Sequence, residues 1–409
     1  MTRRVAVTGI GAISPLGSTW REVERRLRAR RNAVVSLDEW KSYQGLNTSL
    51  AVPVTDFELP AHYTRKRTRS MGRVALLAVR AAELALEQAG LIDDELLRSG
   101  AAGVSFGSST GSVPALTEFA LMRTQKTTRG VNATSYLRMM SHTAAINIGI
   151  FFGLTGRVIP TSTACTAGSQ GIGYACEAIR YGHQDIMIAG GAEELCPTEA
   201  AVFDTLDAVS TRNDAPQSTP RPFDRDRDGL VLGEGACAFV LEEWERAQAR
   251  GARILCEVAG FGTNSDGTHV TRPNSETMQR CVELAVDDAG VDAGAVGYVN
   301  AHGTATESGD IAESQATHAA LGPRMPVSSL KSYIGHTLGA GGALEAWMSV
   351  EMMNSDWYAP TINLDNIDPR CGELDYIVGD GRNLSCEYVM SNNFAFGGIN
   401  TSLIFRRMA

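Results

Sequence analysis

The sequence has few of the features that mark secreted, membrane-bound or metal-clustering proteins. Its eight cysteines form no CxxC or CxxH pair, so no disulfide framework or common metal-ligand spacing is indicated, and a reducing compartment is expected. No apolar run approaches the roughly 20 residues that cross a bilayer. The stretch MTRRVAVTGIGAISPLG leads directly into a strand pattern and lacks the apolar core and cleavage site of a signal peptide. We therefore expect a cytoplasmic protein with no membrane partner.

An excess of positive charge is also missing. The formal net charge is −9, which argues against nucleic acid as the main partner because phosphate binding needs a basic face. The 44% hydrophobic and 20% charged residues are ordinary for a globular protein. The 42 glycines are more than average and predict many tight turns and close backbone approaches.

The chain alternates strand patterns with helix patterns. Such alternation predicts an α/β fold with parallel sheets covered on both faces. Two halves meet near residue 255 without a linker, so we expect residues 1–255 and 256–409 to share an interface. The main helices are expected at 70–91, 166–181, 275–289, 310–321 and 342–353, and strands at 3–11, 101–110, 157–164, 184–193, 235–241, 254–260, 296–303, 325–332, 388–394 and 400–407.

One cysteine lies where a strand pattern ends and a helix pattern begins. In TSTACTAGSQGIGYACEAIR, Cys165 is surrounded by small residues that allow a sharp turn and close approach of a substrate. A helix N-terminus offers unpaired N–H groups and a positive dipole end. We expect this setting to lower the thiol pKa and favour the nucleophilic thiolate. Most cysteines are buried structural residues, and Cys176, Cys237, Cys256 and Cys281 fit that interpretation.

Two histidines provide candidate partners for this nucleophile. His302 follows an apolar strand in VNAHGTATESGD, and His336 lies in a glycine-rich turn before a helix in SSLKSYIGHTLGAGGALEA. We expect each at the carboxyl tip of a parallel strand, the edge where α/β sheets gather their chemistry. The other five histidines lack such settings and are interpreted as surface or packing residues.

Two short motifs point elsewhere: the first leaves a disfavoured alternative and the second is rejected. GSSTG, at 107–111, fits the nucleophile elbow of a serine hydrolase with Ser109 as nucleophile, but no well-placed acid and histidine follow it. GIGAIS resembles a dinucleotide-binding turn, yet Ser14 replaces its third glycine and no acidic residue ends a second strand. The scattered His and Cys residues give no metal-ligand spacing, so no metal is predicted.

Four motifs together identify a family. TACTAG, NAHGTATESGD, KSYIGHTLGAGGALEA and SNNFAFGGIN occur in this order and resemble the β-ketoacyl-acyl carrier protein synthases, the condensing enzymes with a Cys-His-His site. The resemblance covers nearly the whole chain. It implies a thiolase-like fold, with two related βαβαβαββ halves in five αβαβα layers. It also implies an acyltransferase that joins malonyl-carrier protein to a Cys-bound acyl chain with loss of CO₂, in fatty acid or polyene/polyketide elongation.

The resemblance also implies roles for individual residues. Cys165 would hold the acyl chain, and neutral His302 and His336 would stabilise the enolate formed by decarboxylation. The backbone N–H groups of Cys165 and Phe396 would form an oxyanion hole. Lys331 would organise the site by pairing with Glu345, with Asp310 and Glu313 in the same network. Thr304 and Thr306 would hold the phosphopantetheine arm, and Phe394, Phe396 and Thr110 would form the gate and acyl pocket.

Two departures from the family pattern concern the substrate. Ala395 replaces a usual glycine between the two phenylalanines of the last motif, which predicts a stiffer gate because a Cβ restricts positive φ. Thr110 stands where an apolar residue is usual, and a more polar pocket favours an unusual primer. The alternative function is therefore a specialised ketosynthase of an aryl polyene-type or other type II polyketide pathway, working with a partner subunit.

The expected partners are an acyl carrier protein and a second subunit. Lys66, Arg67 and Arg69 lie in the basic stretch RKRTRSMGR and would dock the acidic carrier protein. The family resemblance implies a homodimer, or a heterodimer with a chain-length-factor-like subunit. A non-catalytic subunit is disfavoured because the Cys-His-His residues are intact. No cofactor is expected beyond the phosphopantetheine on the carrier protein, and a structural monovalent cation near Asn300, Glu345 and Asn392 is left open.

Overall fold

The framework of the molecule is one curved, 11-stranded sheet. The computed structural model describes residues 2–408. The strands lie in the order β13-β11-β10-β15-β16-β9-β1-β8-β6-β4-β5. Their bounds are β1 Val5–Ile13, β4 Ala102–Gly107, β5 Val158–Thr161, β6 Ile186–Glu193, β8 Gly235–Glu243, β9 Cys256–Ser265, β10 Val296–Asn300, β11 Pro326–Ser328, β13 Asp375–Tyr376, β15 Tyr388–Ala395 and β16 Ile399–Arg407.

The two halves of this sheet repeat one topology. The two-residue edge strand β13 has no counterpart in the first half. With β13 left out and the strands of each half numbered in chain order, both halves have the spatial order first, fifth, fourth, second, third: β1-β8-β6-β4-β5 and β9-β16-β15-β10-β11. The halves join where β1 pairs with β9 at Ala6↔Glu257 and Val7↔Cys256. This repeat supports, as our proposal, the division of the chain into residues 1–255 and 256–409.

The expectation of purely parallel sheets is wrong for the centre of the molecule. β4, β5 and β6 are parallel, as are β10, β11 and β15. The first and last strands of each half run antiparallel to their neighbours. β15 and β16 form a hairpin, and such a short connection joins antiparallel strands without a crossover helix.

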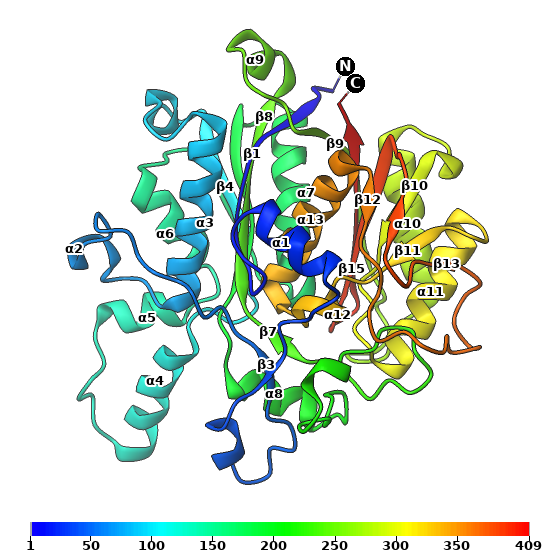
Figure 1. The fold of residues 1–409 in the computed structure, drawn as a ribbon. Coiled ribbons are helices and arrows are strands. Elements are labelled where there is room, and N and C mark those ends of the chain that lie inside the picture. Colours follow the sequence, from blue (N-terminus) through cyan, green and yellow to red (C-terminus); the bar gives the residue numbers. More distant parts are fainter. Residues whose placement is uncertain (1, 409) are drawn as a thin grey trace.

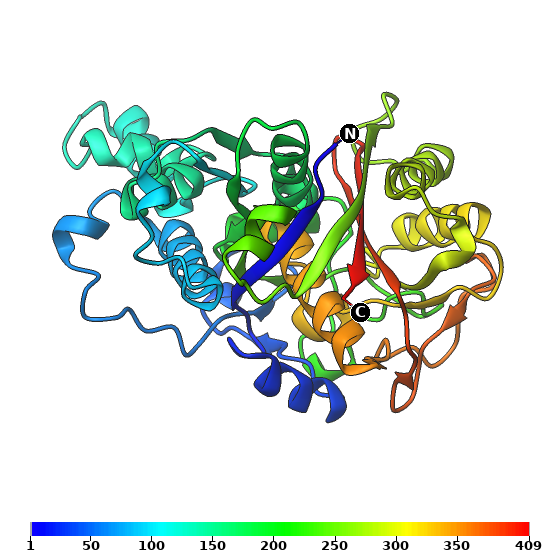
Figure 2. The same ribbon diagram turned by 90° about the horizontal axis from the view of Figure 1, so that it is seen from above.

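Helices form three layers around the two halves of the sheet. α3 (Arg73–Ala89) and α6 (Thr143–Phe152) cover the outer face of the first half. α10 (Ser275–Ala289) and α11 (Glu307–Leu321) cover the outer face of the second. α7 (Ala167–Arg180) and α13 (Gly341–Ser355) pack together between the halves, and Figure 2 shows the resulting five layers, αβαβα. This is the thiolase-like fold.

The two central helices approach each other through glycine. A Cβ on Gly168 would lie 2.8 Å from the backbone nitrogen of Ala343, so a larger residue would force α7 and α13 apart. Buried side chains of both helices belong to the largest apolar cluster of the protein, with β1, β8 and β16. The central layer therefore fixes the position of the loops that precede α7 and α13.

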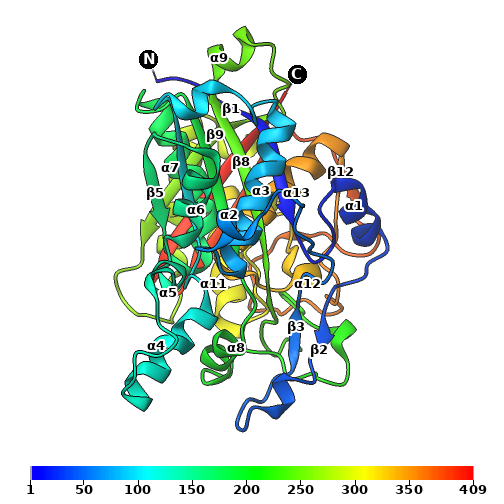
Figure 3. The ribbon, with the colours of Figure 1, turned by 90° about the vertical axis from the view of Figure 1, so that its left-hand side faces the viewer.

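The remaining elements are shorter and mostly peripheral. α4, α8 and the β2–β3 segment project at the end of the molecule that lies away from both termini (Figures 1 and 3). No helix within residues 2–408 is long and apolar enough to cross a membrane. The further bounds are α1 Trp20–Arg28, α2 Arg65–Thr68, α4 Val113–Gln125, α5 Ala133–Met139, α8 Pro197–Asp204, α9 Trp244–Ala249, α12 Lys331–Ile334, β2 Val35–Ser36, β3 Leu50–Val52, β7 Leu232–Gly233, β12 Trp357–Tyr358 and β14 Arg382–Asn383.

Candidate active site

Cys165 lies at the entry to the central helix. β5 ends at Thr161, one short 3-10 turn covers Ala164–Thr166, and α7 begins at Ala167. The turn is sharp because Ala164 adopts φ +50°, a left-handed conformation that costs energy for any residue with a Cβ. The Cys165 side chain is 3% exposed. Its thiol therefore lies at the N-terminal end of α7, inside the molecule.

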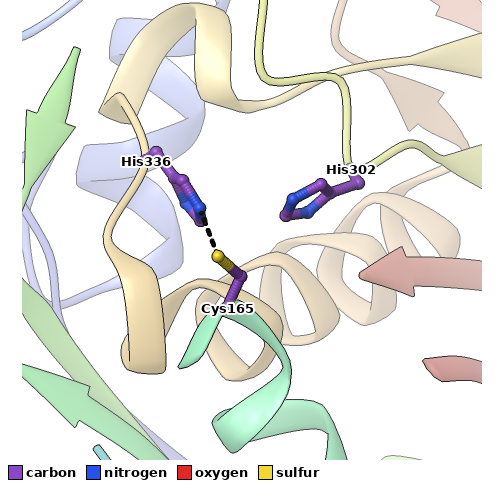
Figure 4. A group of neighbouring side chains, drawn as sticks. All are labelled: Cys165, His302 and His336. Carbon is purple, nitrogen blue, oxygen red and sulfur yellow. Dashed lines mark hydrogen bonds between the residues drawn. The ribbon is translucent and has the colours of Figure 1, made fainter. Parts of the chain in front are cut away.

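Two histidines converge on this thiol. Nε2 of His336 lies 2.9 Å from Sγ of Cys165. The rings of His302 and His336 stand edge to face, with centroids 5.2 Å apart. A ligand atom of each of the three residues lies within 4.8 Å of the others, and Figure 4 shows both rings directed toward the sulfur. The site thus joins residues from both halves of the chain.

The elements that carry the histidines differ from expectation in one respect. His302 follows the parallel strand β10, as expected. His336 does not lie at a strand tip, because the short helix α12 separates it from β11. Gly335, with φ +64°, ends α12 and turns the chain so that His336 enters the site. These three residues are donor types that zinc takes, so the absence of a metal stays a prediction.

Burial controls the protonation of all three groups. Desolvation, and next the Lys331 ammonium, hold the pKa of His302 and of His336 well below 6.5, so both rings are neutral near pH ~7. Desolvation also raises the pKa of the Cys165 thiol to about 11. Lys331 and the backbone N–H groups of Phe396 and Cys165 oppose this rise without overcoming it. The expected lowering of the thiol pKa is therefore wrong, because loss of solvent outweighs the helix N-terminus.

A buried ion pair lies behind the histidines. Lys331 is 1% exposed and its ammonium pairs with the Glu345 carboxylate. The other Glu345 oxygen accepts a hydrogen bond from Nδ2 of Asn393 at 2.8 Å. Glu345, on α13, therefore fixes the position of the Lys331 side chain beside the two imidazoles.

Two buried carboxylates hold the loop after His302. Glu313 accepts the backbone N–H groups of His302 and Gly303 at 2.6 and 2.7 Å. Asp310 accepts those of Ala305 and Phe223 at 3.1 and 2.7 Å. Burial raises the pKa of Glu313 to about 8 and that of Asp310 to about 6. Both residues thus act on the backbone of the loop rather than on Lys331.

A cavity of about 270 Å³ leads to the three residues. Thr304 and Thr306 line it, and their hydroxyl oxygens lie 2.9 Å apart. Phe394 and Phe396 line it as well, and the ring of Phe396 packs on Phe203 at 5.0 Å. The cavity thus has a polar and an aromatic side, while the arm-binding and gate roles of these residues stay predictions.

The gate loop has its positive-φ residues at other positions than the sequence predicts. Ala395 ends β15 in register with Ile399, and the residues with positive φ are Gly397 and Gly398. The methyl group of Ala395 therefore imposes no backbone strain. The loop also bonds to a facing segment, since Gly397 N–H donates to the Val270 carbonyl at 2.8 Å.

Sequence reasoning gave no role to two buried acids near the thiol. Glu193 ends β6 and accepts the backbone N–H groups of Ser109 and Gly339 at 2.8 and 3.0 Å. Glu199 lies on α8 and accepts a hydrogen bond from Thr110, 3.4 Å away. Thr110 itself is exposed and does not line the cavity. The one sequence signal for a role of Glu193 is an acidic residue at the end of an otherwise apolar strand pattern.

The expected docking residues lie on or beside the short helix α2. Lys66 and Arg69 are exposed, and none of the three lines the cavity. Arg67 is tied down, since its guanidinium stacks on Phe151 at 3.6 Å and donates to the Phe151 carbonyl. Lys66 and Arg69 are therefore the freer positive charges of this group.

Fold and site together define a thiol-dependent condensing enzyme. The chain belongs to the β-ketoacyl synthase family: residues 2–247 match "Beta-ketoacyl synthase, N-terminal domain" and residues 255–365 match "Beta-ketoacyl synthase, C-terminal domain". It is an enzyme of the acyltransferase class.

Individual relatives agree with this assignment. The chain is 40% identical to 3-oxoacyl-[acyl-carrier-protein] synthase 2 of Vibrio cholerae, with 99% of each chain covered. It superposes on a crystal structure of a β-ketoacyl synthase from Burkholderia phymatum with TM-score 0.98, at 57% identity over all of both chains. It also resembles the ishigamide ketosynthase/chain length factor, with TM-score 0.90 and 32% identity over both full chains.

Proposed function

We propose that this chain catalyses decarboxylative condensation of malonyl-carrier protein with an acyl chain held on Cys165, as in fatty acid elongation. The observation that carries the proposal is the convergence of Cys165, His302 and His336 within 4.8 Å at a cavity lined by Thr304 and Thr306. The relatives described above include a 3-oxoacyl-[acyl-carrier-protein] synthase, whose name states that the acyl group is carried by acyl carrier protein. A specialised polyketide role is not favoured by those names.

The first half-reaction moves an acyl group from carrier protein to Cys165. The resting sulfur is a thiol, since burial raises its pKa to about 11. Its proton passes to neutral Nε2 of His336, 2.9 Å away, as the sulfur attacks the thioester carbonyl. A new C–S bond forms, the old one breaks, and the departing phosphopantetheine thiol takes the proton.

The second half-reaction forms the carbon–carbon bond. The malonyl carboxylate leaves as CO₂, and its electron pair becomes an enolate whose oxygen needs hydrogen-bond donors. His302 and His336 are neutral and offer N–H groups without competing as acids. For His336 this step uses the tautomer with the proton on Nε2, whereas the first half-reaction uses the tautomer with the proton on Nδ1. The enolate carbon attacks the acyl carbonyl, the bond to Cys165 breaks, and the departing thiolate takes a proton from water. The N–H groups of Cys165 and Phe396 receive the transient oxyanion.

Supporting roles follow from position. Thr304 and Thr306 face the cavity and are suited to bind the phosphopantetheine arm. Oδ1 of Asn300 and Oδ1 of Asn393 are buried without partners beside Glu345. They are oxygen ligands of the kind a structural monovalent cation takes, whereas Oδ1 of Asn392 already accepts from Ser402. This cation stays a proposal, and no step of the reaction needs it.

The partners follow from the same proposal. The acidic carrier protein would meet Lys66 and Arg69, both exposed. A homodimer is our preferred assembly, and the ishigamide ketosynthase with its chain length factor illustrates the heterodimeric alternative. A cytoplasmic location fits eight free cysteines.

The serine hydrolase alternative finds no support at Ser109. Its N–H group binds Glu193 rather than an oxyanion, and within residues 2–408 its hydroxyl has no hydrogen-bonded histidine. Fluorophosphonate labelling of Ser109 would revive this alternative.

The proposed division of labour is tested by separating the two half-reactions. His302→Ala is expected to accept an acyl group on Cys165 at a near-normal rate, because His302 makes no hydrogen bond to the sulfur. The same variant is expected to release CO₂ from malonyl-carrier protein about a hundredfold more slowly. Unchanged CO₂ release would contradict the proposed role of His302.

A further inference from the structure

A second polar region lies beside the active-site thiol. Ala200 and Phe203 of α8 pack in the same apolar cluster as Cys165. Glu199, on the first turn of this helix, is only 7% exposed. A carboxyl group is thus buried on the helix that packs beside Cys165.

The Glu199 carboxyl group is incompletely bonded. Its Oε1 accepts from the Thr110 hydroxyl at 3.4 Å, while its Oε2 is buried without a partner. Within residues 2–408, Glu199 forms no ion pair with Lys or Arg. Buried polar atoms are almost always hydrogen-bonded, so this orphaned oxygen points to a missing partner.

Neighbouring polar groups also lack hydrogen-bond partners. Oε1 of the nearby Glu193, and Oγ of Ser109 beside it, are also buried without partners. Burial, then Glu193 and Glu194, raise the pKa of Glu199 to about 10, so it is a neutral acid that donates an O–H. A fully saturated acyl chain would leave these groups unsatisfied.

We propose that Glu199 is a specificity-determining residue whose carboxylic acid group hydrogen-bonds an oxygen on the acyl chain carried by Cys165. The inference rests on the proposed function and names its substrate class, an acyl chain with a hydroxyl or keto group beyond the thioester. Thr110 orients the acid through its hydroxyl group. A site with a buried hydrogen-bonding group discriminates against the analogue that lacks the partner.

The test compares loading of matched primers. Octanoyl-carrier protein and octanoyl-carrier proteins with one hydroxyl on a distal carbon are offered to wild type, Glu199→Leu, Glu199→Gln and the exposed control Thr198→Ala. The kcat/KM for acylation of Cys165 is followed by intact-mass spectrometry, and thermal melts check folding.

The inference predicts that wild type and Thr198→Ala load at least one hydroxylated primer about tenfold better than octanoyl. Glu199→Leu should lose this preference or reverse it, and Glu199→Gln, which still donates a hydrogen bond, should retain part of it. Equal loading of all primers by wild type, or an unchanged preference in Glu199→Leu, would overturn the inference. Failure of every primer to load would instead contradict the proposed function.

Discussion

The sulfur of Cys165 and Nε2 of His336 lie 2.9 Å apart, although 171 positions separate the two residues in the chain. The contact crosses from one half of the fold to the other, since Cys165 precedes α7 and His336 precedes α13. It exists because these two central helices pack against each other. The predictions below test what this arrangement requires.

Breaking the buried ion pair between Lys331 and Glu345 should lower the stability of the protein strongly. Lys331→Met leaves the Glu345 carboxylate buried without its cation, and we expect a loss of about 3–5 kcal/mol in unfolding free energy. The exposed pair of Arg3 and Asp185 is the control, and Arg3→Met should cost less than about 1 kcal/mol. Urea denaturation measures both. A loss for Lys331→Met as small as the control would contradict a desolvated pair.

The neutral imidazole of His336 predicts a pH dependence of stability. Its pKa lies well below 6.5 in the folded protein, whereas the unfolded chain protonates this ring near pH ~6.5. The linked stability is therefore complete above about pH 6.5 and falls as the pH drops toward the folded-state pKa, by about 1.4 kcal/mol per pH unit. Relative to His336→Asn, wild type should lose stability at this slope in urea titrations. A difference independent of pH would show that the ring is not buried and neutral.

The gate loop should tolerate no side chain at Gly398. This residue has φ +71°, and a Cβ on it would lie 2.7 Å from Cβ of Asp266. We expect Gly398→Ala to lower kcat/KM for acyl loading about tenfold, because the loop is displaced from the cavity. Gly379 has φ +68° with open space around it, so Gly379→Ala shares the backbone strain without the clash. An equal loss of kcat/KM in the two variants would show that backbone strain, and not the clash with Asp266, causes the effect.

Charge reversal on α2 should weaken carrier-protein docking selectively. The double variant Lys66→Glu and Arg69→Glu is expected to raise KM for acyl-carrier protein about tenfold at low salt, and less at high salt because ions screen exposed charges. The double variant Arg21→Glu and Arg31→Glu changes the net charge equally at two other exposed positions. Steady-state kinetics at two salt concentrations test this. An equal rise in KM for the Arg21→Glu and Arg31→Glu variant would show that the carrier protein does not dock specifically on α2.

Much of the fold could be predicted because its signals are local. The helix predicted over 275–289 is α10, and its ends coincide with an Asn274 N-cap and a left-handed Gly290. Helices α1, α4, α5, α6, α8 and α9 were not predicted, and in α4, α6 and α8 the apolar residues follow no clear helical period. The antiparallel centre of the sheet escaped prediction because strand direction depends on which strands become neighbours.

The chemistry of the site was predicted less completely than its residues. The motifs predict Cys165, His302, His336 and Lys331 as site residues. The pKa of the Cys165 thiol depends on its burial, which no local sequence pattern gives. Glu193 was missed as a site residue since its hydrogen bonds reach Ser109 and Gly339, 84 and 146 positions away. Such contacts exist only in the folded chain.

The most direct test of the account is whether an acyl group becomes attached to Cys165. The protein and its Cys165→Ala variant are mixed with octanoyl-carrier protein, and the intact mass of each is recorded. The account predicts a mass increase of one octanoyl group in wild type, located on the peptide that contains Cys165, and no increase in the variant. An adduct that persists in Cys165→Ala, or no adduct on wild type, would contradict it.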